Sequence, residues 1–332
     1  MPEASRILVI KHSALGDLVV AVAAFQAIRR HHPDATIILL TTAPYVGLAE
    51  ASGLFDAVWR DARAPVWRVG AWWRLLRALR RARFDMVYDL QRSQRTAWYF
   101  RALGPRRPAW SGTVRGASHR IRGMTKRRHI ADREAAQLAK AGIRDVRQSD
   151  LSFLDADTTR FGLTPPFALL VPGGAAHRPE KRWPVDQYAE LAQRLRAAGV
   201  QPVVLGTAAE ADLAARIRKA CPETVDLTGR TGFADLAALA RRAACAVGND
   251  TGPMHLLAAA GCPSVTLFGP DSDPVKIAPR GAWVAVCRGD PLAGLAVETV
   301  WAALPAGVPG NGALASTPAG SHVHGGATRP RP

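Results

Sequence analysis

The chain has 332 residues, of which 48% are hydrophobic, and this length and composition suit two domains with a core each. It contains no stretch of about 18 uncharged apolar residues, so the sequence predicts no membrane-spanning helix. The net charge of +17 is uneven, because residues 1–150 hold 27 basic and 12 acidic side chains whereas residues 151–332 hold 17 and 15.

The start of the chain and its cysteines indicate the compartment. The apolar run at residues 7–10 is followed at once by Lys11, so it is too short for a secretory signal peptide. The four cysteines are scattered without CxxC spacing, as expected for free thiols in a reducing compartment. We therefore expect a cytoplasmic protein that has neither disulfides nor a metal site.

The first half of the sequence alternates between strand-like and helix-like segments. Apolar runs predict strands at residues 7–10, 37–40, 57–59 and 86–90, and helical periodicity predicts helices up to about residue 31, over 72–83 and over 130–141. Residues 101–129 hold many glycines and prolines, which predicts a loop-rich segment. The alternation predicts a doubly wound parallel sheet, and the change of pattern at 155–166 predicts a linker.

A basic, tryptophan-rich window covers residues 59–128. It holds 19 basic and 3 acidic residues together with six of the nine tryptophans. Basic residues interleaved with tryptophan suit an acidic partner, such as nucleic acid, an anionic membrane face or a phosphorylated acceptor. The alternative is a solvated helix face in an arginine-rich protein. No helix-turn-helix, RRM or OB pattern accompanies the window, so nucleic acid is not expected.

The second half repeats the alternation. Strands are predicted at 167–171, 200–205, 225–227, 245–247 and 264–268, with helices over 184–198, up to 220, over 233–243 and over 256–260. The Pro/Gly-rich composition from residue 305 predicts a disordered tail. The predicted domains are residues 1–157 and 165–304, followed by the tail at 305–332.

The stretch VGNDTGPMH at residues 247–255 stands where a strand ends and a helix begins. Asp250 or Thr251 can cap the helix, and Pro253 suits its first turn. The backbone N–H groups of Thr251 and Gly252 then lie at the positive end of the helix dipole, which favours an anion. The alternative is a capped turn with no ligand.

Neither half contains a GxGxxG or GxxxxGK[ST] motif, which argues against a dinucleotide dehydrogenase and a P-loop NTPase. Loops at the carboxyl ends of parallel strands are where open α/β sheets bind ligands. We therefore expect a nucleotide-diphosphate ligand in the second domain and another substrate in the first.

Three separated stretches resemble glycosyltransferase family 9, the bacterial heptosyltransferase group. They are ILVIKHSALGD at 7–17, PGG at 172–174 with KRWP at 181–184, and NDTGPMH at 249–255 with LFGP at 267–270. The resemblance spans about residues 5–304 in the family's order and spacing.

The resemblance implies a GT-B fold, in which two Rossmann-like domains with doubly wound parallel sheets face each other across a cleft. It also implies an inverting transferase that needs no metal or other cofactor. The implied donor is a nucleotide-sugar, usually ADP-heptose. The implied acceptor is an anionic glycolipid of the lipopolysaccharide inner core, so the protein would work in the cytoplasm with peripheral contact to the inner membrane.

Site residues follow from the chemistry and from the resemblance together. Inverting transfer needs a base for the acceptor hydroxyl, and Asp17, after the first strand, is the candidate; its alternative role is to favour a helix N-terminus. The leaving pyrophosphate needs fixed donors, for which the candidates are Lys181, Asp250, Thr251, Gly252, Pro253 and His255. The expected cleft-lining residues are Ser13, Gly16, Gly173 and Gly174. Trp183 is expected in the core.

Two alternatives stay open. The same fold could use another hexose or an aminosugar on UDP or ADP, or it could be a noncatalytic nucleotide-sugar- or nucleic-acid-binding module. A binding module does not need a carboxylate at Asp17, so that residue discriminates between the two classes.

Overall fold

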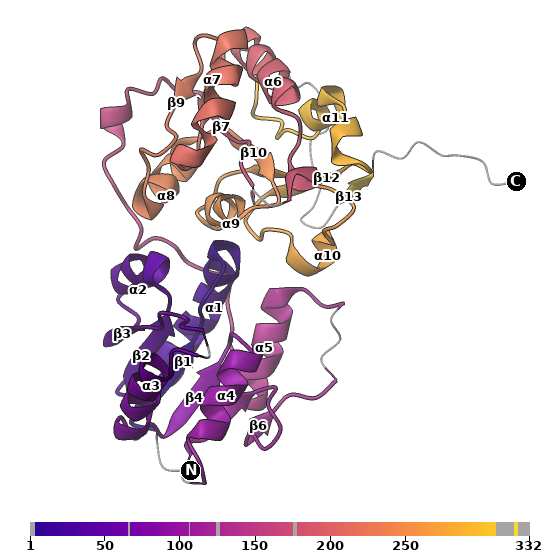
Figure 1. The fold of residues 1–332 in the computed structure, drawn as a ribbon. Coiled ribbons are helices and arrows are strands. Elements are labelled where there is room, and N and C mark those ends of the chain that lie inside the picture. Colours follow the sequence, from indigo (N-terminus) through magenta and orange to yellow (C-terminus); the bar gives the residue numbers. More distant parts are fainter. Residues whose placement is uncertain are drawn as a thin grey trace, which may run out of the picture. The chain divides into compact units, whose positions relative to one another are not determined.

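A computed structural model of the chain describes residues 4–65, 67–105, 107–123, 127–174, 178–309 and 322–324. The chain divides into two compact units, Met1–Phe153 (unit 1) and Leu154–Pro332 (unit 2). The division falls just ahead of the segment at 155–166 that the sequence predicts as a linker. Each unit is an α/β fold around a parallel sheet (Figure 1).

The sheet of unit 1 has the order β3-β2-β1-β4-β5-β6, and every pairing in it is parallel. Its strands are β1 (Arg6–Ile10), β2 (Thr36–Thr41), β3 (Ala57–Arg60), β4 (Met86–Asp89), β5 (Ala109–Gly112) and β6 (His119–Arg120). Its helices are α1 (Leu15–His31), η1 (Ala43–Tyr45), α2 (Val46–Ala51), α3 (Val69–Arg81), α4 (Gln94–Ala102) and α5 (Ile130–Lys140), η marking a 3₁₀ turn.

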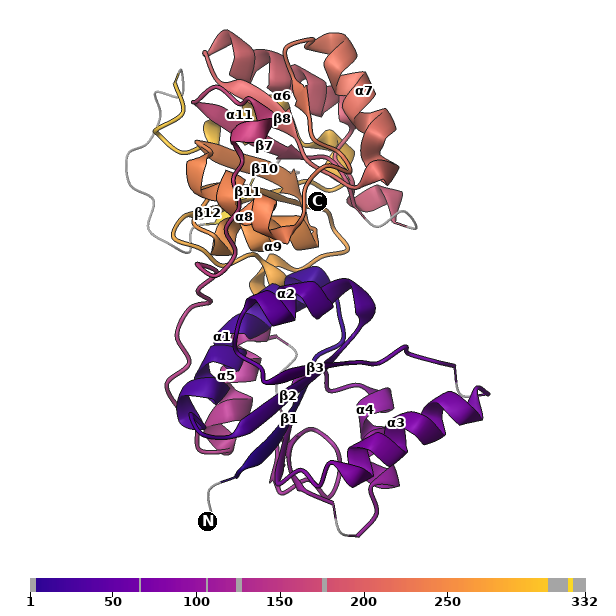
Figure 2. The same cartoon turned by 90° about the vertical axis from the view of Figure 1, so that its left-hand side faces the viewer.

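Strand β1 is an almost continuous apolar run because helices cover both faces of the sheet. Leu8 and Ile10 belong to the buried cluster formed with α3, α4 and β5, while α1 and α5 pack together on the opposite face (Figure 2). The chain leaves β1 for β2 on one side and then returns to add β4 on the other. The loop after β1 therefore lies at the point where the strand order reverses, where such sheets bind ligands.

The sheet of unit 2 has the order β13-β12-β11-β10-β7-β8-β9, again parallel throughout. Its strands are β7 (Phe167–Val171), β8 (Gln201–Val204), β9 (Val225–Asp226), β10 (Cys245–Asn249), β11 (Ser264–Phe268), β12 (Val284–Arg288) and β13 (His322–His324). Its helices are η2 (Thr159–Phe161), η3 (Pro179–Lys181), α6 (Val185–Ala197), η4 (Ala208–Glu210), α7 (Ala211–Ala220), α8 (Phe233–Arg242), α9 (Gly252–Ala259), α10 (Pro274–Ile277), η5 (Leu292–Gly294) and α11 (Val297–Ala302).

Trp183 and Tyr188 lie in the core of unit 2, together with buried residues of its strands. Trp183 is buried as expected, and its indole N–H donates to the Leu295 carbonyl oxygen at 2.8 Å. Helices α6, α7 and α11 contribute to this core. Strand order reverses here between β7 and β10, so the loops that follow these two strands lie at the switch point.

Three differences from the sequence-based expectation concern secondary structure. The segment at 101–129 is largely loop, as expected, but it also contains two short strands: β5 pairs with β4, and β6 pairs with β5. Helices α2, α4, α10 and α11 were not predicted, and neither was strand β12. The tail expected to be disordered contains β13 beside β12, and residues 310–321 and 325–332 lie outside the described residues.

Among the described residues, no helix combines the length and the apolar character that crossing a bilayer requires.

Candidate functional site

The loops that follow β7, β10 and β11 in unit 2 are adjacent because these strands are neighbours in the sheet. The loop after β7 begins with Pro172, Gly173 and Gly174, and the loop after β10 begins with Asp250 and Thr251. The stretches that carry the family resemblance in this unit therefore converge at one edge of the sheet, at its switch point.

Asn249, the last residue of β10, joins these loops. Its buried Nδ2 donates to the carbonyl oxygens of Pro172 at 2.9 Å and Gly173 at 3.0 Å. Its Oδ1 accepts from the Trp183 N–H at 3.0 Å and from the Tyr188 hydroxyl at 3.1 Å. Because both amide protons and the amide oxygen are used, Asn249 fixes the PGG turn and the KRWP segment against β10.

Asp250 forms an ion pair with Lys181 at the same edge of the sheet. Lys181, at the end of η3, places its Nζ 3.5 Å from Asp250 Oδ2, and the Ser272 hydroxyl donates to that oxygen at 2.8 Å. The side chains of Lys181 and Asp250 are 18% and 9% exposed, so the ammonium group is partly desolvated but reachable. Three separate loops thus position one positive charge.

The N-terminus of α9 lies directly after Asp250. Thr251 is the N-cap residue, but its side chain makes no capping hydrogen bond, so the predicted side-chain cap is absent. Pro253 stands in the first turn as predicted, where its missing N–H costs nothing. The other first-turn amides have no acceptor within the helix and lie at the positive end of its dipole, as an anion site requires. His255 is buried on the same helix.

Gly173 and Gly174 serve close packing. An added Cβ on Gly173 would lie 2.9 Å from Glu210 Cγ, and one on Gly174 would lie 3.3 Å from Arg182 Cγ. The Glu210 carboxylate accepts from the Thr207 N–H at 2.8 Å and from its hydroxyl at 2.6 Å. The glycines therefore let Glu210 and Arg182 approach the backbone of this turn, a neighbourhood that the sequence did not indicate.

Asp17 of unit 1 lies in the first turn of α1, directly after the loop that follows β1 at the switch point. It is partly exposed, and no hydrogen bond or ion pair of its carboxylate is found within the described ranges. Burial raises the pKa of Tyr45, and the nearby Asp17 charge raises it further. Gly16 is buried, and Ser13 Oγ accepts a long hydrogen bond of 3.5 Å from Arg63.

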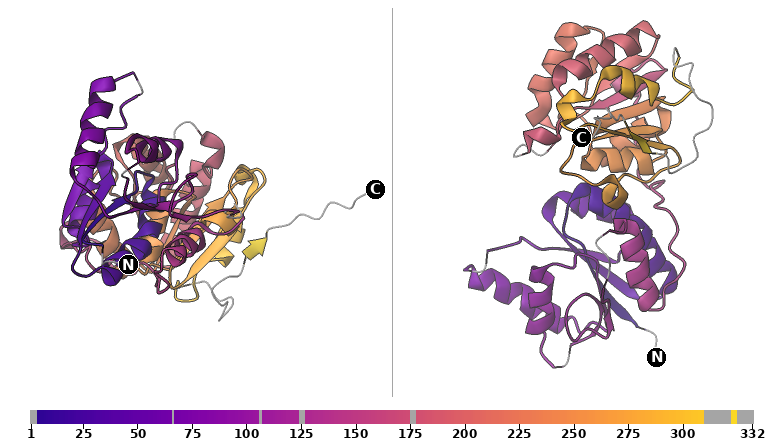
Figure 3. Two further views of the ribbon diagram at one scale, coloured as in Figure 1. Left: turned by 90° about the horizontal axis from the view of Figure 1, so that it is seen from below. Right: turned by 90° about the vertical axis from the view of Figure 1, so that its right-hand side faces the viewer.

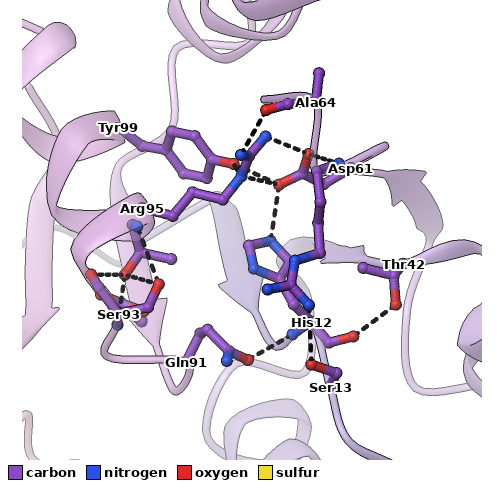
Figure 4. Close-up of polar contacts among 12 residues, drawn as sticks. His12, Ser13, Thr42, Asp61, Ala64, Gln91, Ser93, Arg95 and Tyr99 are labelled. Atoms are coloured by element: carbon purple, nitrogen blue, oxygen red, sulfur yellow. Dashed lines mark hydrogen bonds and ion pairs between the residues drawn. The ribbon is translucent and has the colours of Figure 1, made fainter. Parts of the chain in front are cut away.

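A buried polar cluster lies beside this loop and was not predicted from the sequence (Figure 4). Asp61, just after β3, accepts from Arg95 Nε and Nη2 at 3.0 Å each and from the Tyr99 hydroxyl. His12 Nε2 lies 3.2 Å from Asp61 Oδ2. The Asp61 carboxylate is thus shared by α4 and by the loop that leads to α1.

His12 is held by both its backbone and its ring. Its N–H donates to Gln91 Oε1 at 2.8 Å, and its carbonyl oxygen accepts from the Thr42 hydroxyl at 2.7 Å (Figure 4). Burial lowers the pKa of His12 to about 4, an effect that Asp61 opposes and Arg95 reinforces. A neutral imidazole therefore anchors the loop that carries Ser13 and leads to Asp17 in the first turn of α1.

Lys11, the residue before His12, is also buried. Its Nζ donates to Glu134 Oε1 at 2.7 Å, and an Nη atom of Arg92 lies 3.8 Å from the same oxygen. The two cations that flank Glu134 connect the end of β1 to α5 and to the loop after β4. Lys11 therefore has a structural role in this part of the protein.

A hollow of about 480 Å³ opens between β3, α3 and α4 of unit 1. Trp59 and Trp72 form part of its apolar wall, Arg60 and Arg74 supply positive charge, and the charge of Arg95 is balanced by Asp61. Burial raises the pKa of Asp61, but the hydrogen bonds from Arg95 and Tyr99 outweigh this effect and lower it overall. The hollow therefore suits an anionic ligand with a partly apolar face.

One sequence signal could have revealed the His12–Asp61 cluster. Asp61 is one of only three acidic residues in the basic window at 59–128. An isolated acid among many arginines is a candidate for a buried ion pair, since an unpaired buried carboxylate is costly.

A search of the described residues for metal sites gives no group of three or more His, Cys, Asp or Glu side chains placed to hold an ion.

Similarity to known proteins extends over most of the chain. The model of glycosyltransferase family 9 (heptosyltransferase) matches residues 72–293. Lipopolysaccharide heptosyltransferase 2 of Salmonella typhimurium is 28% identical over 80% of this chain and 83% of its own length. The solved structure of a family 9 glycosyltransferase from Veillonella parvula matches with a TM-score of 0.77 and 22% identity, covering 90% of this chain and 96% of that one. E. coli ADP-heptose lps heptosyltransferase II matches with a TM-score of 0.74 and 24% identity, covering 91% and 98%.

These structural matches confirm the predicted GT-B fold class with two Rossmann-like units. The family model covers more than half of the sequence and includes Lys181 and the whole NDTGPMH stretch. The chain therefore belongs to glycosyltransferase family 9 (heptosyltransferase), and it is a glycosyltransferase.

Proposed function

We propose that the protein is an inverting transferase that moves a heptose from ADP-heptose to an inner-core glycolipid of lipopolysaccharide. Two similar proteins bear names that support this assignment, a lipopolysaccharide heptosyltransferase 2 and an ADP-heptose lps heptosyltransferase II. The observation that carries it is the pairing of Lys181 with Asp250 directly before the N-terminus of α9.

Unit 2 is the donor-binding domain in this proposal. The leaving group is a nucleoside diphosphate, whose negative charge grows as the glycosidic carbon–oxygen bond breaks. The Lys181 ammonium and the first-turn amides of Thr251 and Gly252 are already oriented before reaction, so little reorganisation opposes their stabilisation of that charge. Asp250 keeps Lys181 in place, while Pro253 and His255 shape the first turn.

Unit 1 is the acceptor-binding domain and supplies the base. Asp17 takes the proton of the acceptor hydroxyl as the oxygen of that group attacks the anomeric carbon from the face opposite the diphosphate. The new carbon–oxygen bond forms as the bond to the diphosphate breaks, so the anomeric configuration inverts. No metal ion or other cofactor is needed in this scheme.

The anionic acceptor suits the hollow of unit 1, which Arg60 and Arg74 line together with an apolar wall, while Arg95 is paired with Asp61. Because such an acceptor is embedded in a bilayer, we place the protein in the cytoplasm with peripheral contact to the inner membrane.

Thermal unfolding with ADP, UDP and GDP tests the donor. A ligand that binds only the folded state stabilises it by about 2.7 kcal/mol at a hundred times its Kd. ADP should raise the Tm most, and ADP-heptose should raise it further. A larger shift with UDP or GDP would assign another donor, and no shift with any of the three would contradict a nucleotide-sugar enzyme.

A further inference from the structure

Most of the exposed large apolar side chains lie in unit 1, and Trp67, Val69 and Trp73 lie close together at the start of α3. Among the described residues the most exposed are Trp67 at 76%, Val69 at 70%, Trp98 at 57%, Val275 at 57% and Trp73 at 56%. All except Val275 lie in unit 1. Tryptophan is costly to leave in water, so two exposed tryptophans and an exposed valine within seven residues point to an interaction surface at the start of α3.

Helix α3 separates its two faces sharply. Leu79 is buried in the unit 1 core, and Trp72, Leu75 and Leu76 pack against that core. On the opposite face, Val69, Trp73, Arg77 and Arg81 follow one another at four-residue spacing, and all are exposed. Figure 2 and the right panel of Figure 3 show the beginning of α3 at the periphery of unit 1, away from β1 and β2.

All charged residues of α3 are arginines. No acidic residue occurs between Asp61 and Asp85, whereas arginines occur at 63, 68, 74, 77, 80, 81 and 83. The Arg77 guanidinium lies 4.8 Å from the centre of the Trp73 ring, which is within the range of a cation–π interaction. Arg80 is the exception on this side, since it donates to the Ala102 carbonyl oxygen at 3.1 Å and thereby joins α3 to α4.

An anionic bilayer fits this combination better than another protein does. Tryptophan prefers the headgroup region of a membrane, where its ring is shielded and its N–H stays hydrated. Arginines beside it pair with lipid phosphates, and each basic residue near such a surface strengthens the attraction to it. Helix α3 has 13 residues, too few to span the bilayer, so it would lie in the interface.

We infer that the α3 patch, defined as Trp67, Arg68, Val69, Trp73, Arg77 and Arg81, docks unit 1 onto an anionic lipid surface. The aromatic and apolar side chains at the start of the helix enter the headgroup region, and the arginines pair with phosphates along the helix. This inference deepens the proposed function, because it assigns the membrane contact to particular residues. It also explains why so strong a basic charge is combined with exposed tryptophan.

Cosedimentation of the full chain with vesicles tests the inference. Wild type should bind vesicles of phosphatidylcholine mixed with phosphatidylglycerol and should bind vesicles of phosphatidylcholine alone much more weakly. Trp67→Ala combined with Trp73→Ala should lower partitioning to mixed vesicles about tenfold or more, since both anchors are lost. Arg77→Gln combined with Arg81→Gln should lower it and reduce its dependence on salt.

Trp98→Ala is the matched control. Trp98 on α4 is as exposed as Trp73 and also lies beside an arginine, since Arg101 is 5.6 Å from its ring centre, but it is outside the α3 patch. This variant should bind vesicles like wild type. Equal losses for Trp98→Ala and the double tryptophan variant, or wild-type binding by the double variant, would overturn the assignment to α3.

The ADP-dependent rise in Tm separates this inference from the proposed function. Every variant should keep the wild-type rise, because the substitutions lie in unit 1 and the donor residues in unit 2. The single variant Trp67→Ala changes a side chain that precedes the helix and is mostly in solvent, so it tests the surface without disturbing the core. Vesicle binding without any ADP response in wild type would contradict the donor and leave the membrane surface supported. An ADP response without vesicle binding would support the donor and contradict the membrane surface.

Discussion

Nε2 of His12 lies 3.2 Å from Oδ2 of Asp61, and both side chains are almost fully buried. This contact joins the loop before α1 to the end of β3, two segments that are far apart in the sequence. Asp61 is already paired with Arg95 and Tyr99, so its carboxylate stays ionised while burial keeps the His12 ring neutral. We therefore expect protonation of His12 to destabilise the loop that leads to Asp17.

The free energy of unfolding of wild type should fall relative to that of His12→Gln as the pH falls from 6.5 to about 4. In this window the unfolded chain is protonated at His12 and the folded chain is not, so protons favour unfolding. The lowered pKa corresponds to about 3 kcal/mol, since one pKa unit is worth about 1.4 kcal/mol. Above 6.5 the residue is neutral in both states, and the difference should be constant.

The comparison with His12→Gln is needed because other buried groups titrate in the same range. Burial raises the pKa of Asp89 to about 6, so this carboxyl is protonated first in the folded state and stabilises it as the pH falls. Burial and the charge of His31 lower the pKa of His32 to about 4, which acts in the same direction as His12. Urea unfolding at a series of pH values measures the difference. A constant difference throughout would contradict a neutral, buried His12.

Asp61→Asn should lower the free energy of unfolding by about 2–4 kcal/mol, because Arg95 and Tyr99 then face an uncharged amide in a buried setting. Asp145→Asn is the control, since Asp145 pairs with Arg147 at an exposed position and its loss should cause no measurable change. Urea unfolding of both variants gives the comparison. Equal stability of the two variants would show that the Asp61 cluster does not hold the loop.

The strands were largely predictable, because parallel strands covered on both faces are continuous apolar runs. β1 and β7 are of this kind, and no alternative assignment fits them. Helix α4 was missed although Ser93 and Thr96 form a capping box at its start. Its exposed Trp98 and its charged residues do not follow the spacing of an amphipathic helix. β5 depends on pairing with β4 and β6 on pairing with β5, which local sequence does not reveal.

The residues around β10 could be placed from sequence because their geometry is local. A strand that ends in Asn249 and Asp250, followed by a proline in a first helical turn, leaves few arrangements. The contact between His12 and Asp61 could not be derived in this way, since only the sheet order β3-β2-β1 brings the two residues together. The contact of Ser272 with Asp250 could not be derived from sequence either, because Ser272 lies in the loop after another strand.

Asn249→Ala should destabilise the protein by about 3–5 kcal/mol and weaken ADP binding, because it leaves several buried polar groups without partners. Tyr188→Phe is a graded control. It removes one donor to Asn249 and should cost about 1 kcal/mol, with ADP affinity almost unchanged. Denaturant unfolding and calorimetric titration with ADP provide both numbers. If the two variants lost the same stability, Asn249 would not be the residue that fixes the loops.

Asp17→Asn and Lys181→Ala should separate the two halves of the proposed reaction. Loss of the base should lower kcat by about 10²–10⁴-fold and leave ADP affinity within a few-fold, because the carboxylate acts on the acceptor hydroxyl. Loss of the Lys181 cation should weaken ADP binding about tenfold or more, since a charge-assisted contact to the diphosphate disappears. Steady-state kinetics with a soluble acceptor fragment and calorimetry with ADP distinguish the effects. A loss of ADP affinity in Asp17→Asn as large as that in Lys181→Ala would mean that Asp17 supports the fold of its loop and is not the base.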